Sequence, residues 1–202
     1  MRIILATRNA GKIREFADLL GPLSFEFLPQ AELGIEPPEE TGETFEDNAL
    51  LKARHAVALS GLPAMADDSG LEVDALGGAP GVRSARYAGE GADDLANLKK
   101  LLDAMKGVPD NLRSSRFHCV IALVSNLEDR SPVLGRGVWE GTILRAPRGS
   151  GGFGYDPVFA PRGEQRSVAE LAAAEKHARS HRSTALRDLH ARVCGVTGSI
   201  GR

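Results

Sequence analysis

The chain opens with a short apolar segment that leads into an amphipathic helix pattern, and this pairing does most to set the fold class. Residues 2–6 (RIILA) have the length and aliphatic content of a buried β-strand. Beyond Lys12, apolar side chains recur at helical spacing, at Ile13, Phe16, Ala17 and Leu20. A second strand is expected at Ser24 to Leu28. Strands that alternate with helices are typical of α/β domains.

The rest of the chain continues this mixture. A helix is expected to begin at Thr44, a good capping residue with Asp47 three positions later. Another is expected over residues 93–106, with an apolar stripe at Leu95, Leu98, Leu102 and Met105. Further strands are predicted at residues 62–65, 117–124, 133–139 and 142–144, and helices at 168–179 and 180–193. The sequence therefore predicts one α/β domain over residues 1–202, a mixed sheet flanked by helices.

Composition excludes several classes of protein. Of the 202 residues, 42% are apolar and 26% are charged, as in ordinary globular proteins. The formal net charge of −2 argues against a nucleic-acid-binding surface. The longest aliphatic run, Cys119 to Val124, is far shorter than the ~20 residues of a membrane helix. Neither a signal peptide nor a metal or disulfide spacing of Cys119 and Cys194 is evident, so a cytoplasmic protein is expected.

The first segment with chemical potential is the strand-to-helix turn Thr7-Arg8-Asn9-Ala10-Gly11-Lys12. The N-terminus of a helix offers backbone N–H groups and a partial positive charge, which suits a phosphate. The spacing is not that of a Walker A loop, since Ile13 follows the lysine. An ordinary loop with a solvent-facing lysine is the alternative interpretation of this segment taken alone.

The second segment is Asp67-Asp68-Ser69, placed by the pattern at the end of a strand. Cleavage of a polyphosphate generally needs a divalent metal and a base that activates water, and adjacent carboxylates supply both. Oxygen ligands of this kind suit Mg²⁺, and Glu39 or Glu40 could complete the set. Neighbouring side chains on a strand point in opposite directions, so one of the two aspartates could serve only to brace the turn. The alternative is an acidic turn in solvent.

Two further segments carry aromatic and cationic groups. In Gly151-Gly152-Phe153-Gly154-Tyr155-Asp156-Pro157, glycines allow a close approach to a flat ligand and Phe153 or Tyr155 offers a ring for stacking. Near the C-terminus, Lys176 precedes Ser180-His181-Arg182, in which Ser180 is expected to cap a helix. Core aromatics and a solvated basic helix end are the alternatives. His118, His177 and His190 receive no role.

Taken together, these segments make the sequence similar to the inosine triphosphate pyrophosphatase family. The resemblance rests on T-x-N-x-x-K at the start, F-x-x-N-A-x-x-K-A from Phe45 to Ala53, A-D-D-S-G-L with the following G-G-x-P-G, G-G-F-G-Y-D-P, and K-x-x-x-S-H-R. These motifs occur in the family's order over nearly the whole chain. Arg8 departs from the pattern, because many members have a small residue there.

The resemblance implies an Mg²⁺-dependent hydrolase that converts ITP, dITP and XTP to the nucleoside monophosphate and pyrophosphate and so clears them from the nucleotide pool. It implies an elongated fold of two lobes around a central cleft, and a homodimer with neither nucleic acid nor membrane as partner. Asp68 would be both metal ligand and proton acceptor, Glu39 would be the second metal ligand and Lys52 would face the phosphates. Substrate would also be bound by Thr7, Arg8, Asn9, Ala10, Gly11, Lys12, Ser69, Phe153, Gly154, Tyr155, Asp156, Lys176, His181 and Arg182.

Two other functions compete with this interpretation. A pyrophosphatase for other nucleotides, such as modified pyrimidine triphosphates, would use a similar cleft. A nucleotide sensor without hydrolytic activity would lack a metal or base residue, yet Asp68, Glu39 and Lys52 are all present. A nucleic-acid-binding module lacks the basic and aromatic clustering that it would need.

Overall fold

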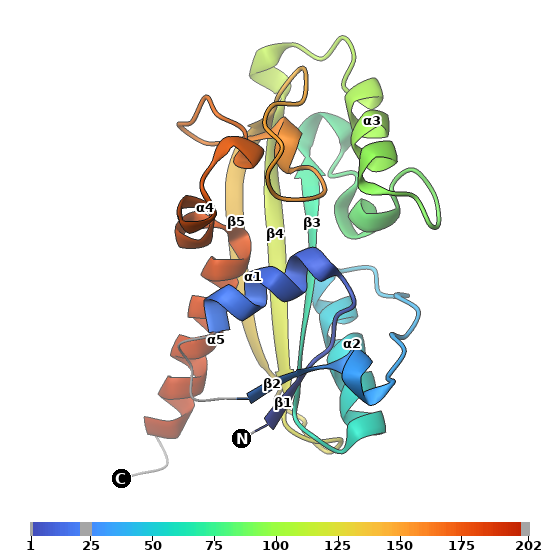
Figure 1. Cartoon of the computed structure of the whole chain (residues 1–202), viewed down its shortest axis with the longest axis vertical. Helices are drawn as coiled ribbons and strands as arrows, with labels where there is room; N and C mark the ends of the chain where they lie inside the picture. Colours follow the sequence, from blue (N-terminus) through green and yellow to red (C-terminus); the bar gives the residue numbers. More distant parts are fainter. Residues whose placement is uncertain (1, 21–25, 199–202) are drawn as a thin grey trace. The chain divides into compact units, whose positions relative to one another are not determined.

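The fold is a mixed β-sheet with helices, described by a computed structural model over residues 2–20 and 26–198. The strands are β1 (Arg2–Leu5), β2 (Glu26–Pro29), β3 (Ala64–Val73), β4 (Ser114–Val124), β5 (Val133–Ile143) and β6 (Phe159–Pro161). The α-helices are α1 (Ala10–Leu20), α2 (Phe45–Ser60), α3 (Asp94–Ala104), α4 (Ala173–Arg179) and α5 (His181–Gly198) (Figure 1). The strand order is β2-β1-β3-β4-β5-β6, with β1 parallel to β2 and β3, and β5 antiparallel to β6. The predicted α/β class is confirmed.

The chain forms two compact units. The first comprises residues 1–68, 119–137 and 182–202, and the second comprises residues 69–118 and 138–181. Each of the long strands β3, β4 and β5 contributes residues to both units. The expected cleft between two lobes and the assignment of residues 1–202 to one domain stay predictions.

The first unit is built around α1, α2 and the N-terminal strands. Helix α2 begins where the sequence indicates, because Thr44 accepts a hydrogen bond from the Asp47 backbone N–H at 3.1 Å. Glycine ends the same helix: Gly61 has φ +69°, and its N–H donates to the Val57 carbonyl. The buried apolar cluster of this unit contains Ile3, Leu5, Phe16, Met65, Cys119, Ile121, Ala185 and Leu189.

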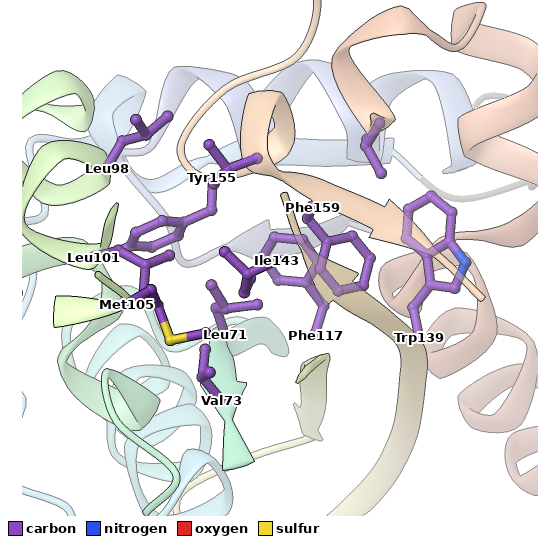
Figure 2. Close-up of a cluster of buried hydrophobic side chains, with 12 residues drawn as sticks. Leu71, Val73, Leu98, Leu101, Met105, Phe117, Trp139, Ile143, Tyr155 and Phe159 are labelled. Carbon is purple, nitrogen blue, oxygen red and sulfur yellow. The ribbon is translucent and has the colours of Figure 1, made fainter. Parts of the chain in front are cut away.

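The second unit has an apolar core of its own, shown in Figure 2. Leu71 and Val73 of β3 lie near Leu101 of α3 and Met105, the residue that caps this helix, in this view. The core also holds aromatic rings, with Phe117 and Phe159 at 4.6 Å and Trp139 and Phe159 at 5.9 Å between ring centroids. Burial of an aromatic or aliphatic side chain contributes roughly 1.5–3 kcal/mol to folding, so this cluster stabilises the second unit.

Four local predictions need correction. β3 does not stop at the aspartates but runs on to Val73, because Leu71 and Val73 are buried. The strands expected at 133–139 and 142–144 are one strand, β5, and the helix expected at 168–179 is a 3₁₀ turn at 168–170 followed by α4. In α3, Leu95 is 72% exposed, and Leu101 lies in the core instead. The strand expected from Ser24 is described only from Glu26, and Ser24 lies outside the described residues.

Gly135 of β5 packs closely against α5. A Cβ atom at this position would lie 2.2 Å from the Ala185 carbonyl oxygen and 2.6 Å from the Leu189 Cβ. The nearest atom belongs to the backbone and cannot move aside as a side chain can. We therefore expect Gly135→Ala to lower the free energy of unfolding by about 1–3 kcal/mol or more. Urea unfolding would measure the change, with Val138→Ala, a 43% exposed site on the same strand, as the control. Equal stability of Gly135→Ala and the wild type would contradict this account of the packing.

Candidate active site

The two adjacent aspartates face different partners because they lie within a strand. Asp67 and Asp68 are successive residues of β3, whose side chains alternate between its faces. Asp67 contacts Lys12 of α1, with 2.8 Å between its Oδ2 and the lysine Nζ. Asp68 contacts Lys52 of α2, with 2.8 Å between Oδ1 and Nζ. One short motif therefore supplies two separate charge clusters in the first unit.

The Asp68 cluster consists of two carboxylates, one ammonium and one amide. Lys52 also donates to Glu40, at 2.8 Å, so a single ammonium joins both acids. Asn48, one helical turn before Lys52, donates from Nδ2 to Asp68 Oδ2 at 3.4 Å. The Asn48 amide oxygen accepts from the Gly42 backbone N–H at 2.8 Å, which ties the preceding loop to the same helix face.

The Gly42 position depends on the absence of a side chain. A Cβ atom there would lie 2.6 Å from Asn48 Oδ1, too close for any other residue without displacement of the amide. The loop that carries Glu40 is thereby held against α2.

Burial and charge set the protonation of this cluster. Burial is the main influence on Asp68 and raises its pKa above the ordinary aspartate value, with the Glu40 charge acting in the same direction and Lys52 and Lys12 opposing it. For Lys52, burial opposes the charged form, but Asp68, Asp67 and Glu40 outweigh it and raise the pKa to about 12. The lysine is therefore a permanent cation, and Asp68 is a carboxylate with more affinity for a proton than an exposed one.

The Asp67 cluster is a buried chain of alternating charges. Asp67 Oδ2 accepts from Lys12 and also lies 3.4 Å from Arg182 Nε. The Arg182 guanidinium reaches Glu15 of α1, with 2.5 Å between Nη1 and Oε2. Burial disfavours the charge of Asp67, but Lys12, Arg182 and Lys52 together hold its pKa well below the usual range. Two acids and two bases thus neutralise one another inside the first unit.

The turn before α1 has the geometry expected of a helix N-terminus. Asn9 caps the helix: its Oδ1 accepts from the Lys12 backbone N–H at 3.0 Å. Thr7 is buried, and its hydroxyl accepts from the Asn9 N–H at 3.3 Å. Arg8 is exposed and pairs with Glu36. Ala10 and Gly11 form the first turn of α1, so their backbone lies beside Lys12.

In the second unit, Asp156 organises the glycine-rich segment. Its Oδ2 accepts from the Phe153 backbone N–H at 2.9 Å and from Lys176 Nζ of α4 at 2.7 Å. The same lysine ammonium lies 4.8 Å from the centre of the Phe153 ring, a cation–π distance. A Cβ atom at Gly152 would lie 2.0 Å from Asp156 Oδ2, so only glycine permits this turn. Phe153, Asp156 and Lys176 therefore lie together in the second unit.

Tyr155 and His181 have different surroundings from Phe153. The Tyr155 ring belongs to the apolar core, and its hydroxyl donates to the Ser84 carbonyl at 2.8 Å. This burial makes Phe153 the partly exposed ring of the segment. His181 is buried and stacks on Phe117, with ring centroids 4.8 Å apart and an interplanar angle of 11°. Gly154 donates its N–H to Asp94 at 2.8 Å.

The structure shows the surroundings of the remaining predicted site residues. Arg182, predicted to bind the substrate, has Glu15 and Asp67 as described partners. Glu39, expected to bind metal, is exposed, and it is Glu40 that shares Lys52 with Asp68. Glu15 was missed altogether, although its spacing of three residues from Lys12 places both on one helix face. Ser69 follows Asp68 in β3 and is half-buried.

Cations and carboxylates of this arrangement can bind a phosphate chain and take a proton from water. Among the described residues, groups of three or more His, Cys, Asp or Glu side chains arranged to hold a metal are absent. Over the same residues, every helix is too short or too polar to cross a bilayer. A metal at Asp68 and Glu40 would thus depend on water and substrate oxygens for the rest of its ligands, which is usual for Mg²⁺ at phosphate sites.

Comparison with known proteins places this chain in a family. A sequence model of the Ham1 family matches residues 3–192. The dITP/XTP pyrophosphatase of Shigella flexneri is 54% identical over 186 residues, which is 92% of this chain and 94% of that protein. That of Vibrio cholerae is 54% identical over 188 residues, 93% of this chain and 94% of that one.

Solved structures agree with the sequence match. A HAM1 protein from Coxiella burnetii superposes with a TM-score of 0.88 at 49% identity, over 96% of this chain and 99% of its own. A nucleoside-triphosphatase / dITP/XTP pyrophosphatase from Mycobacterium abscessus gives a TM-score of 0.75 at 45% identity, over 94% and 97% of the two chains. Since sequence and fold both match over nearly the full length, the chain belongs to the Ham1 family.

Proposed function

We propose that this protein hydrolyses the non-standard purine nucleoside triphosphates ITP, dITP and XTP to the nucleoside monophosphate and pyrophosphate. The observation that carries the proposal is the Asp68 cluster: a buried carboxylate, bound by Lys52 and Asn48, next to a second acid, Glu40. Sequence identity of 54% with dITP/XTP pyrophosphatases over nearly the whole chain supports the same reaction and substrate class.

Asp68 acts as the proton acceptor for the attacking water. Its pKa is raised by burial, which makes it a stronger base than an exposed aspartate. Lys52 stabilises the ionised carboxylate and is positioned to neutralise charge on a phosphate brought to Asp68. Asn48 fixes the orientation of the Asp68 carboxylate by donating a hydrogen bond to Oδ2, the oxygen that Lys52 does not contact.

Phosphate binding is assigned to the turn before α1 and to Lys12. The helix N-terminus capped by Asn9 contributes backbone N–H groups and a partial positive charge, and Lys12 contributes a full one. Arg8 is exposed beside Glu36, so its contribution to affinity is expected to be smaller than that of Lys12.

Mg²⁺ fits the acids of the Asp68 cluster. Asp68 and Glu40 converge on the Lys52 ammonium, so two hard carboxylate oxygens already surround one positive charge. We assign these two as the protein ligands, with Glu39 as the alternative predicted from sequence. When bound, the ion would polarise phosphate oxygens and lower the pKa of a bound water.

Base recognition is assigned to Phe153, Asp156 and Lys176. The partly exposed Phe153 ring offers a stacking surface, and the Lys176 ammonium is held beside it by Asp156. Hypoxanthine and xanthine carry an oxygen at position 6, where adenine carries an amino group. A hydrogen-bond donor of the protein therefore finds an acceptor on hypoxanthine and xanthine but not on adenine. An unmade buried hydrogen bond costs about 1–3 kcal/mol, or roughly ten- to a hundredfold in selection.

The test is a hydrolysis assay with ITP, dITP and XTP beside ATP, GTP and modified pyrimidine triphosphates, with and without Mg²⁺. Both products would be identified by chromatography. We expect monophosphate and pyrophosphate from the first three substrates only, and only with the metal. Release of orthophosphate would contradict the reaction assigned to the site. Tight binding without turnover would favour a nucleotide sensor. A homodimer in the cytoplasm, without nucleic acid or membrane as partner, stays the expectation for its biological state.

A further inference from the structure

We propose that Asp67 is a positioning residue that holds the Lys12 ammonium for phosphate binding, and that Glu15 supports it by neutralising Arg182. The inference rests on the phosphate role proposed for Lys12. Asp67, next to the proposed base, and Glu15 of α1 act through Lys12 and do not touch the substrate themselves.

The geometry is a linear chain of contacts within the first unit. Lys12 Nζ lies 2.8 Å from Asp67 Oδ2, Arg182 Nε lies 3.4 Å from the same oxygen, and Arg182 Nη1 lies 2.5 Å from Glu15 Oε2. The side-chain exposure is 12% at Lys12, 0% at Asp67, 4% at Arg182 and 9% at Glu15. Lys12 is therefore the most exposed member, and Asp67 and Arg182 are buried between the two ends of the chain of contacts.

The order of charges explains why Asp67 serves Lys12. Alone, Arg182 would compete with Lys12 for the single buried carboxylate. Glu15 contacts the Arg182 guanidinium at Nη1, and this contact is shorter than the one between Arg182 and Asp67. Asp67 is therefore left to pair closely with Lys12. Lys12 and Glu15 both belong to α1, so the same helix supplies the first and the last member of the chain.

A merely stabilising role would not require this arrangement. A buried ion pair is often no more stabilising than apolar side chains of similar volume, because desolvation offsets most of the attraction, although removal of one partner alone is costly. A flexible lysine stem, by contrast, gains from a fixed partner, since side-chain entropy is otherwise lost when it binds a ligand. Without Asp67, a nearly buried ammonium would also turn toward water, away from its present site.

The experiment is a double-mutant cycle on Asp67→Asn and Lys12→Met. Two quantities would be measured for each variant: the dissociation constant of inorganic pyrophosphate by calorimetry with Mg²⁺, and kcat/KM for dITP. We expect Asp67→Asn alone to weaken pyrophosphate binding about tenfold, and to have no further effect in the Lys12→Met background. Additive losses, or unchanged binding in Asp67→Asn, would overturn the proposal.

Two additions keep the test decisive. If Asp67→Asn does not fold, as judged by circular dichroism, Glu15→Gln takes its place in the same cycle, with a smaller loss that must likewise vanish with Lys12→Met. Asp74→Asn is the charge-matched control, because Asp74 pairs with Arg116 in the second unit and should leave both constants unchanged. Wild-type protein that binds pyrophosphate but does not hydrolyse dITP would refute the proposed reaction alone, whereas failure to bind pyrophosphate would refute the role of Lys12 and Asp67.

Discussion

Asp68→Asn is expected to lower kcat for dITP by about 10²–10⁴-fold while the protein stays folded. An amide cannot take a proton from water, and it gives a metal less charge to bind. The fold should tolerate the change, because burial already disfavours the ionised carboxylate and Lys52 keeps Glu40 as a partner. Steady-state kinetics with dITP, beside circular dichroism of the same preparation, would measure both.

The control for this variant is Asp103→Asn, which makes the same chemical change on α3 at an exposed pair with Lys106. It should retain the kcat of the wild type. Turnover in Asp68→Asn within a few fold of the wild type would rule out Asp68 as the base. Loss of the circular dichroism signal would instead show that the Asp68 cluster holds the first unit together.

Local signals in the sequence predicted most elements and explain several short-range contacts of the candidate site. The Thr44 cap placed the start of α2, and helical spacing brought Asn48 and Lys52 to one face. Both depend on residues within a few positions of one another, where backbone geometry alone decides which side chains meet. The same holds for Phe153 and Asp156, which are joined within one turn.

Contacts between distant segments were beyond such reasoning. Glu15 and Arg182 are separated by 167 residues, and only the packing of α5 in the first unit brings them together. The aspartates were expected at a strand end because the short apolar segment at residues 62–65 precedes them. β3 accepts them because two lysines and an arginine neutralise them from outside the strand. A local sequence pattern does not reveal partners that lie far away along the chain, so the strand was predicted too short.

Asp67→Asn is expected to produce the largest loss of stability, and one that depends on pH. Replacement leaves Lys12 and Arg182 facing an amide in a buried cluster, and removal of one partner from such a cluster costs about 3–5 kcal/mol. The difference in the free energy of unfolding between wild type and variant should therefore be greatest near pH 7. Urea unfolding at a series of pH values would measure it.

The direction of the pH dependence follows from the lowered pKa of Asp67. The unfolded chain takes up a proton at the ordinary aspartate value of 3.8, whereas the folded carboxylate, held ionised by Lys12 and Arg182 against the cost of burial, does so only at lower pH. The contribution of Asp67 to stability is thus present above pH 3.8 and is lost as the pH falls through the folded value. The wild-type advantage over Asp67→Asn should shrink below about pH 4, by roughly 1.4 kcal/mol for each pH unit. A gap that stays constant between pH 7 and pH 3 would mean that the carboxylate charge is not what holds α1, β3 and α5 together.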